Sequence, residues 1–245
     1  MMSKRAMSHF IWAIVPAAGR GERFGGGVPK QYLQLHGQPL IVHALQRLLE
    51  HPQVAGAVVA LAADDPHWPD IRRDYGKPVL ECVGGASRAQ SVLAALQRLP
   101  EDVEDDALVL VHDAARPCLR SDDLDRLIEA ARLDPVGALL AAPVRDTLKC
   151  ADAHMHVIAT EPRDQLWRAL TPQAFRRGTL TRALREAEQA GVVITDEAMA
   201  IERLGLQPLL VQGAEDNLKI TVPADLALAE SILDNMIDNR QITNP

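Results

Sequence analysis

The sequence predicts the α/β fold class, and three observations lead to that prediction. Short, continuous apolar runs recur along the chain, amphipathic stretches of helical period lie between them, and one polar segment interrupts the alternation. Continuous apolar runs are typical of strands buried on both faces, and strands that alternate with helices form a mostly parallel sheet. We therefore predict a mostly parallel, Rossmann-like three-layer sandwich with a protruding β-hairpin arm.

Six apolar runs predict the buried strands of the sheet. They do not alternate apolar and polar residues, as a strand with one solvent-exposed face would. The runs are residues 11–15, 57–62, 79–83, 107–112, 137–142 and 207–211. Sheets of this kind bind ligands beyond the carboxyl ends of their strands, so we expect the functional residues there.

Five amphipathic stretches predict the helices. In residues 39–50, for example, leucine, isoleucine and alanine recur every three to four positions. The other stretches are residues 87–98, 121–133, 178–190 and 223–232. Two of them open on sequences typical of helix caps, Ser121-Asp-Asp and Thr221-Val-Pro-Ala-Asp.

Residues 142–167 form the polar segment that breaks the alternation. They predict two short strands around a turn at 151–154, in a hairpin with little apolar content of its own. An isolated two-stranded hairpin is marginally stable in water. We therefore expect this arm, at about residues 143–168, to pack on another surface, such as that of a second subunit.

One domain accounts for most of the chain. The 245 residues contain no internal repeat or low-complexity tract, and hydrophobic residues make up 47%, enough for a full core. We expect a flexible N-terminal tail at residues 1–9, a single domain at 10–235 that includes the arm, and a C-terminal tail at 236–245.

Charge and cysteine content count against several kinds of protein. The net charge of −7 would repel the phosphates of a nucleic acid, although local cations can still bind a small anion. Cys82, Cys118 and Cys150 are an odd number at wide spacing, unlike a disulfide framework or a zinc site. The apolar run at 10–15 is too short for a membrane span or a signal peptide. We expect a cytoplasmic protein with neither nucleic-acid nor membrane partners.

The first candidate site is the loop that follows the first strand. Its small residues, Pro16-Ala-Ala-Gly19, let backbone N–H groups approach a phosphate closely. The loop matches neither GxxxxGK[ST] nor GxGxxG. Arg20, Arg23 and Lys30 instead supply three cations, which suits a polyanion whose charge grows during reaction. The alternative is a surface loop with solvated cations, and the strand that ends in Pro-Ala-Ala-Gly favours the ligand site.

The second candidate is Asp113, on which the strand sequence LVLVHD ends. A carboxylate at that edge can bind Mg²⁺ or accept hydrogen bonds from substrate hydroxyls, and Arg116 lies one turn further on. The alternative is a structural ion pair between these two residues. No metal ligand is certain from the sequence, and Asp113 is the candidate. His112 is expected in the core, and His154 and His156 on the solvated arm.

Three further segments contain candidates with an equally simple structural explanation. Gly84-Gly85 and a helix start near Arg88 offer N–H groups to a nucleotide, and Ser91 can contact its base or ribose. Thr195 precedes a helix and can point its hydroxyl into the cleft. Lys219 can bind a phosphate if the fold places it at the site. The alternatives are an ordinary strand–turn–helix, a helix cap and a solvated lysine.

Seven motifs occur together in one order: VPAAGRGERF…PKQY, GGASRAQSV, VHDAARP, APVRDT, ALTPQ, ITDEA and DNLKIT. This ordered set resembles the 2-C-methyl-D-erythritol 4-phosphate cytidylyltransferases of the non-mevalonate isoprenoid pathway, from about residue 11 to 233. The resemblance implies a nucleotidyltransferase domain that uses CTP as substrate with Mg²⁺ or another divalent cation. It transfers the cytidylyl group to methylerythritol phosphate, giving 4-diphosphocytidyl-2-C-methyl-D-erythritol and pyrophosphate.

The resemblance also implies roles for individual residues. Positions on the nucleotide side match Pro16, Ala17, Ala18, Gly19, Gly84, Gly85, Arg88, Ser91 and Ala114. Positions on the methylerythritol phosphate side match Asp113, Arg116, Thr147, Arg163, Thr171, Thr195 and Lys219. Catalytic positions that stabilise the transition state match Arg23 and Lys30, and those that position the attacking phosphate match Arg163 and Lys219.

The resemblance further implies a homodimer with interlocked arms, in which Thr147 or Arg163 serves the neighbour's site. Ala86 departs from the family, because many members carry an acidic residue there. This departure puts in doubt any side-chain contact from that position. A ribitol 5-phosphate cytidylyltransferase is one alternative, and a nucleotide-binding regulatory subunit without catalysis is another.

Overall fold

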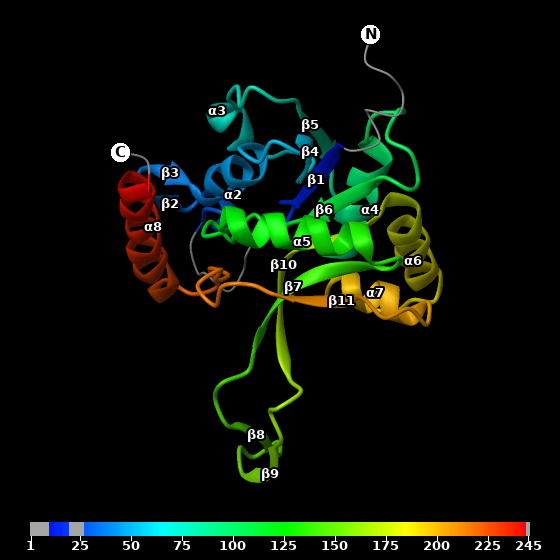
Figure 1. The fold of residues 1–245 in the computed structure, drawn as a ribbon, viewed down its shortest axis with the longest axis vertical. Helices are drawn as coiled ribbons and strands as arrows, with labels where there is room; N and C mark the ends of the chain where they lie inside the picture. Colours follow the sequence, from blue (N-terminus) through cyan, green and yellow to red (C-terminus); the bar gives the residue numbers. More distant parts are fainter. Residues whose placement is uncertain (1–9, 20–26, 244–245) are drawn as a thin grey trace.

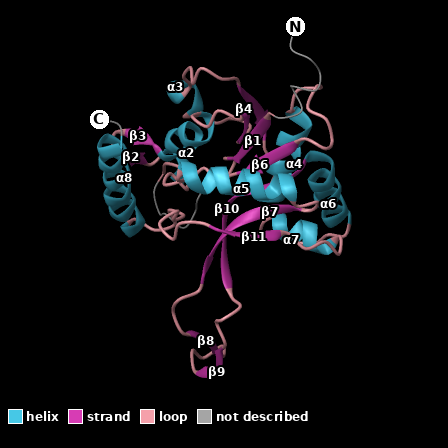
Figure 2. Cartoon of the chain, in the orientation of Figure 1, coloured by secondary structure: helices cyan, strands magenta, loops and turns pink. Residues whose placement is uncertain are grey.

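A seven-stranded mixed sheet forms the middle layer of the fold (Figures 1 and 2). A computed structural model of the chain describes residues 10–19 and 27–243, with the sheet order β11-β7-β10-β6-β1-β4-β5. Its strands are β1 (Ile11–Pro16), β4 (Val54–Leu61), β5 (Val79–Val83), β6 (Leu108–Val111), β7 (Gly137–Pro143), β10 (Trp167–Arg176) and β11 (Leu209–Gln212). The predicted α/β fold is confirmed, and each predicted run overlaps an observed strand.

β10 differs from the other strands of the sheet because it is antiparallel to its neighbours and because the sequence pattern did not predict it. β1 pairs in parallel with β4 and β6, β4 with β5, and β7 with β11, whereas β10 is antiparallel to both β6 and β7. β10 mixes polar with apolar residues, and its pairing with β7 is irregular between Ala169 and Gln173. The apolar-run pattern therefore does not predict it, because pairing on both sides rather than composition defines this strand.

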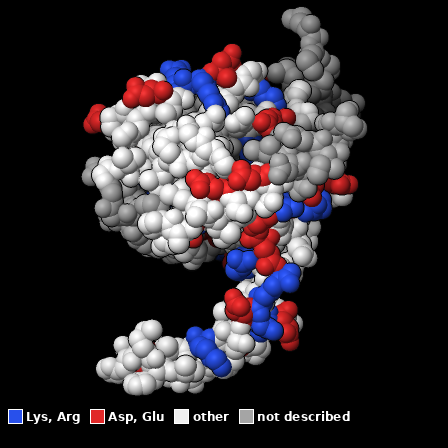
Figure 3. Space-filling view, turned by 90° about the vertical axis from the view of Figure 1, so that its left-hand side faces the viewer, with Lys and Arg blue, Asp and Glu red and all other residues white. Residues whose placement is uncertain are grey.

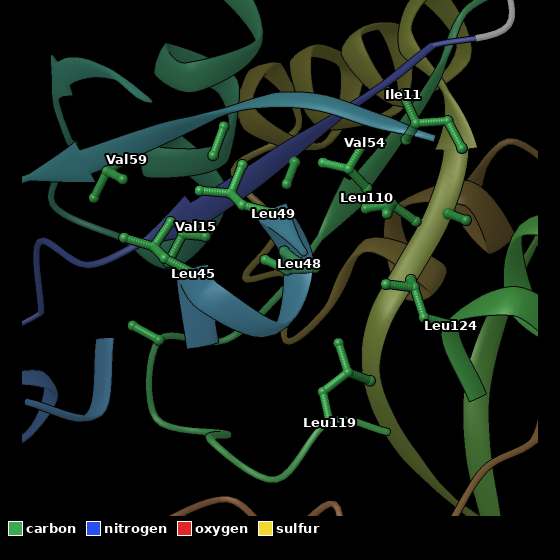
Figure 4. Packing of buried hydrophobic residues seen from close by; sticks show 14 of the residues in the cluster. Ile11, Val15, Leu45, Leu48, Leu49, Val54, Val59, Leu110, Leu119 and Leu124 are labelled. Carbon is green, nitrogen blue, oxygen red and sulfur yellow. The ribbon is translucent and has the colours of Figure 1, made fainter. Parts of the chain in front are cut away.

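Helices cover both faces of the sheet and make it the centre of two cores. The α2 (Leu40–Leu49) and α5 (Ser121–Leu133) helices pack on one face, where Ile11 and Val15 of β1 are buried (Figure 4). The α4 (Arg88–Arg98), α6 (Arg177–Gln189) and α7 (Glu197–Arg203) helices pack on the other, against Trp12 and Ile14. Burying each large aliphatic side chain stabilises the fold by about 1.5–3 kcal/mol. Both faces of β1 are therefore packed in a core, and this packing fixes the position of the strand end from which the site loop begins.

A third, smaller core joins the C-terminal helix to a short hairpin. The hairpin comprises β2 (Gln34–Leu35) and β3 (Gln38–Pro39), and Leu35 packs with Leu233 of α8 (Ala224–Thr243). Two further short helices are η2 (Lys30–Tyr32) and α3 (Trp68–Ile71). α8 continues to Thr243, past the expected domain boundary at residue 235. In the described part of the chain, no helix combines the length and apolarity needed to cross a membrane.

Helix starts differ in part from those expected. Ser121 is the first helical residue of α5 and Arg120 precedes it without a side-chain cap, so the expected serine cap is wrong. At α8 the cap is reversed, because the carboxylate of Asp225 accepts hydrogen bonds from the N–H groups of Thr221 and Val222. Ser87 does cap α4, in a reciprocal capping box with Gln90. The start of α4, which borders the site, is therefore fixed locally.

The predicted arm protrudes from the ends of β7 and β10 (Figures 1 and 2). Its tip is the two-stranded sheet of β8 (Leu148–Ala151) and β9 (Val157–Glu161). Met155, Val157 and Ile158 are exposed there. Figure 3 shows acidic and basic side chains interspersed along the stalk and a mostly uncharged tip. The arm therefore presents apolar side chains to solvent in the single chain.

Candidate functional site

A cavity of about 920 Å³ opens at the carboxyl edge of β1, β4, β5 and β6, where the architecture predicts a ligand. Three of the predicted segments line it, at residues 16–19, 84–88 and 113–115, together with the start of η2 and the segment around Lys219. The lining includes the predicted residues Pro16, Ala17, Ala18, Gly19, Lys30, Gly84, Gly85, Arg88, Ser91, Asp113, Ala114 and Lys219. The fold thus brings the residues predicted for the nucleotide side together with Asp113 and Lys219 in one cavity.

Other predicted residues lie away from the lining of this cavity. Arg23 lies outside the described residues, as does Arg20. Arg116 and Thr171 lie behind Asp113 and are almost fully buried. Thr147, Arg163 and Thr195 are exposed and do not line the cavity in the single chain. Their roles as substrate ligands stay predictions.

Gln31 supports the first loop from beneath, and its role was not predicted from the sequence. This side chain is buried in η2, and its Nε2 donates hydrogen bonds to the carbonyls of Ala17 (2.7 Å) and Gly19 (3.2 Å). These two hydrogen bonds tie the backbone of residues 17–19 to η2. The PKQY motif contained the signal, since it places Gln31 beside Lys30.

The two glycine-containing loops touch each other across the cavity floor. A Cβ atom on Gly84 would lie 2.6 Å from Cβ of Ala18 and 2.8 Å from Oγ of Ser91. Ser91 is buried, and its hydroxyl accepts from the N–H of Gly85 (3.1 Å) and donates to the carbonyl of Ser87 (3.0 Å). Glycine is required at position 84 because any side chain would separate the loops. Ser91 acts in this structure by shaping the loop.

Asp113 is the centre of a buried ionic cluster. Its Oδ1 accepts from Nε of Arg88 at 3.1 Å, and its Oδ2 lies 2.9 Å from Nζ of Lys219 and 3.5 Å from Nε of Arg116. Arg88 in turn forms a bidentate pair with Glu197, with N–O distances of 2.5 and 3.0 Å. Burial alone would raise the pKa of Asp113, but the three cations hold it well below its usual range. Asp113 is therefore a carboxylate at neutral pH.

A hydrogen-bonded chain behind Asp113 fixes its backbone. The N–H of Asp113 donates to Oγ1 of Thr171 (3.1 Å), which contacts Nδ1 of His112 (3.0 Å), and Nε2 of His112 contacts the carbonyl of Arg116 (3.0 Å). A carbonyl only accepts, so Nε2 carries the proton and the Thr171 hydroxyl donates to Nδ1. Burial lowers the pKa of His112 to about 4, which keeps the ring neutral. His112 is a core residue, as expected, and Thr171 is committed to this chain of bonds.

Asn217 anchors the segment that delivers Lys219 to the cavity. It is fully buried, its side-chain Nδ2 donates to the carbonyl of Thr171 (2.8 Å), and its backbone carbonyl accepts from Nη1 of Arg116 (2.6 Å). Ile220 then bonds through its N–H to the carbonyl of Ala115 (2.9 Å). These bonds place Lys219 beside Asp113. A phosphate-binding role for Lys219 depends on this placement, which could not be predicted from the sequence.

Among the described residues, the lining of the cavity provides no protein-held magnesium site. Asp113 is the one carboxylate among the described lining residues, and cations already occupy both of its oxygens. Within residues 10–19 and 27–243, no group of three histidine, cysteine or acidic side chains is placed to hold a metal. Magnesium prefers oxygen ligands that include carboxylates or substrate phosphates. The residues present therefore do not fit a resident metal ion.

The fold and the site together define a class of protein. A parallel-sheet edge with a glycine-lined cavity and an adjoining cationic cluster is typical of α/β enzymes that bind a nucleotide and act on a second anionic substrate. A family model described as IspD, 2-C-methyl-D-erythritol 4-phosphate cytidylyltransferase, matches residues 11–235. The chain belongs to this 2-C-methyl-D-erythritol 4-phosphate cytidylyltransferase family.

Curated relatives and solved structures agree with this assignment. A 2-C-methyl-D-erythritol 4-phosphate cytidylyltransferase of Xanthomonas campestris pv. campestris (strain 8004) is 64% identical over 229 residues, covering 94% of this chain and 86% of that protein. The enzyme of that name from Stenotrophomonas maltophilia (strain R551-3) is 62% identical over 227 residues, covering 93% and 98%. The crystal structure of the Francisella tularensis enzyme of that name has a TM-score of 0.80 at 32% identity, covering 91% and 99%.

Proposed function

We propose that this chain transfers the cytidylyl group of CTP to 2-C-methyl-D-erythritol 4-phosphate in the non-mevalonate isoprenoid pathway. The products are 4-diphosphocytidyl-2-C-methyl-D-erythritol and pyrophosphate. One observation supports this reaction above all: the cavity joins a glycine-lined nucleotide side to the cluster of Asp113 and Lys219. The relatives of this chain from Xanthomonas campestris and Stenotrophomonas maltophilia are named for this activity, and the chain covers 86% and 98% of their lengths.

The chemistry needs alignment and charge stabilisation more than a base. A phosphate oxygen of methylerythritol phosphate attacks the α-phosphorus of CTP, the bond between that phosphorus and the bridging oxygen breaks, and pyrophosphate leaves. The substrate phosphate is already an anion at neutral pH, so no proton has to be removed. The backbone of Pro16–Gly19 holds the triphosphate side, and Lys30 stabilises the charge that develops there. Lys219 holds the attacking phosphate.

Divalent metal enters this proposal only with the substrate. Because the described lining of the cavity lacks a ligand set of its own, a cation such as Mg²⁺ would arrive bound to the phosphates of CTP. Such an ion would neutralise phosphate charge, while Lys30 and Lys219 bind the phosphates of the two substrates. A cytoplasmic location is also part of the proposal, and the free state of Cys82, Cys118 and Cys150 supports it.

We also propose that two copies of the chain pair through their arms. The exposed apolar side chains of Met155, Val157 and Ile158 support this, since a single chain leaves them in water. Thr147 and Arg163 lie on the same arm, far in sequence from the cavity-lining residues. Pairing would allow them to reach the cavity of the neighbouring copy.

Pyrophosphate release measures the proposed reaction directly. The purified chain should release pyrophosphate with CTP and methylerythritol phosphate, and much more slowly when ATP, GTP or UTP replaces CTP. A faster reaction with ribitol 5-phosphate would instead assign the chain to ribitol 5-phosphate cytidylyltransferases. Binding of CTP without pyrophosphate release from either polyol phosphate would contradict the proposal and favour a regulatory role.

A further inference from the structure

Glu197 is a buried carboxylate with no role in the proposed reaction. It is the first residue of α7, its exposed fraction is 1%, and it does not line the cavity. Both of its oxygens accept hydrogen bonds from Arg88, at 2.5 Å from Nη1 and 3.0 Å from Nη2. A bidentate pair of this kind fixes the plane of the guanidinium as well as its distance.

Arg88 passes this constraint on to Asp113. It begins α4, next to the glycine loop, and its remaining edge donates through Nε to Oδ1 of Asp113 at 3.1 Å. The guanidinium is thereby held between carboxylates from two other parts of the chain. The resemblance assigned Arg88 to the nucleotide side, but in this structure both of its hydrogen-bonding edges face protein carboxylates.

Asp113 then holds the ammonium group that faces the substrate. Its second oxygen lies 2.9 Å from Nζ of Lys219, and Lys219 lines the cavity. Opposite charges therefore alternate from Glu197 through Arg88 and Asp113 to Lys219. Each side chain in this series restricts the position of the next.

We infer that Glu197 is a positioning residue, which fixes Arg88 and Asp113 and so sets the place of Lys219 for the phosphate of the polyol substrate. This inference rests on the proposed function and adds to it a residue that does not touch either substrate. Burial opposes the charge on both partners of this pair and raises the pKa of Glu197, although Arg88 counteracts that rise. At Arg88 the carboxylates of Glu197 and Asp113 outweigh burial and raise the pKa, in agreement with the bidentate geometry.

A positioning role and a purely electrostatic role predict opposite results. The cluster has three cations, Arg88, Arg116 and Lys219, against two carboxylates, which leaves one net positive charge. If Glu197 only neutralised charge, its removal would make the cluster more positive and strengthen phosphate binding. If Glu197 positions Arg88, its removal lets Asp113 and Lys219 shift, and phosphate binding weakens.

The variant Glu197→Gln keeps the shape of the side chain and removes its charge. We expect the KM for methylerythritol phosphate to rise about tenfold or more and kcat to fall by a similar factor, as after loss of a charge-assisted hydrogen bond. The KM for CTP should stay within about threefold of the wild-type value, because among the described residues Glu197 forms no hydrogen bond with residues 16–19 or 84–87, which we propose to bind CTP. Glu202→Gln is the matched control, since Glu202 is exposed on the same helix.

Three results would overturn the inference. One is a Glu197→Gln enzyme with the kinetics of Glu202→Gln, and another is a lower KM for methylerythritol phosphate. A third is an equal rise in KM for both substrates, which indicates general loosening of the fold. Turnover of CTP and methylerythritol phosphate by the wild type and by Glu202→Gln separately checks the proposed function.

A second variant keeps the test decisive, since loss of a buried ion pair can prevent folding. Arg88→Lys retains the positive charge but cannot form the bidentate pair, and we expect the same selective loss with methylerythritol phosphate. In the double variant with Glu197→Gln, the loss should be no greater than in the more damaging single variant. If Arg88→Lys instead raises the KM for CTP alone, Arg88 is a nucleotide ligand and the inference is wrong.

Discussion

Single residues at this site are held by more partners than their sequence neighbours suggest. Asp113 has three cationic partners, and only Arg116 lies near it in sequence. Thr171 and His112 carry no charge at neutral pH, yet they hold the backbone of Asp113. Each of these contacts joins residues that are distant along the chain, except those between positions 112 and 116.

Removal of the Lys30 ammonium should slow the chemical step. We expect Lys30→Ala to lower kcat by about 10²–10³, the usual effect of removing one preorganised donor from a centre of developing charge. Steady-state kinetics with both substrates would measure it, with thermal unfolding to confirm folding. Arg203→Ala, which removes an exposed cation on α7, is the control. A normal kcat in Lys30→Ala would remove Lys30 from the catalytic residues.

Burial of neutral His112 should make the fold sensitive to acid. Its pKa is about 4 in the folded chain and about 6.5 in the unfolded chain, so between these values the unfolded state binds more protons. Stability from this group is complete above about pH 6.5 and declines as the pH falls, by about 3 kcal/mol at pH 4.

Denaturant unfolding at several pH values would measure this dependence. In His112→Gln the slope of unfolding free energy against pH should decrease between about pH 4 and 6.5. His154→Gln, on the exposed arm, should keep the wild-type slope. Equal slopes in His112→Gln and the wild type would show that His112 does not titrate in this way.

Elements of the fold meet at the site through their ends. β1 and β5 each end in a loop of small residues, and these loops contact each other at Ala18 and Gly84. α4 begins directly after the β5 loop with its capping box. The cavity floor is therefore made by strand ends whose separation is set by the parallel pairing of β1, β4 and β5. This arrangement gives a prediction about the loops.

A methyl group at position 84 should separate the two loops. In Gly84→Ala the new Cβ would lie 2.6 Å from Cβ of Ala18 and 2.8 Å from Oγ of Ser91, which is too close for either contact to remain without a shift. Overpacking of this kind typically costs about 1–3 kcal/mol, so we expect the KM for CTP to rise about 10- to 100-fold. Gly213→Ala is the control, because its Cβ would meet neighbours at ordinary distances of 3.4–3.5 Å. An unchanged affinity for CTP in Gly84→Ala, measured by titration calorimetry, would exclude this contact from nucleotide binding.

In the whole molecule, the residues predicted to bind the polyol substrate lie in two separate places, the sheet edge and the arm. Asp113 and Lys219 lie at the sheet edge, whereas Thr147 and Arg163 lie on the arm that extends from it (Figure 1). If the arm acts on a neighbouring copy, one complete site needs residues from two chains. Interfaces between identical subunits are most often two-fold symmetric, so each dimer would contain two such shared sites.

Mixing two inactive variants would test this sharing. Lys30→Ala and Arg163→Ala should each lose most activity as homodimers, but in a mixed dimer one of the two sites would have both residues intact. After random exchange of subunits, we expect about a quarter of the wild-type activity per site. No recovery on mixing, with mixed dimers verified by mass spectrometry, would mean that Arg163 serves its own chain or neither site.

The sequence by itself determined the class of fold, the positions of most strands and helices, and the segments that build the site. It did so because continuous apolar runs, helical periodicity and glycine-rich loops are local signals. It did not determine β10, the support of the loop by Gln31 or the series from Glu197 to Lys219. Only the tertiary structure decided those features, because hydrogen bonds and ion pairs between distant residues leave no periodic pattern along the chain.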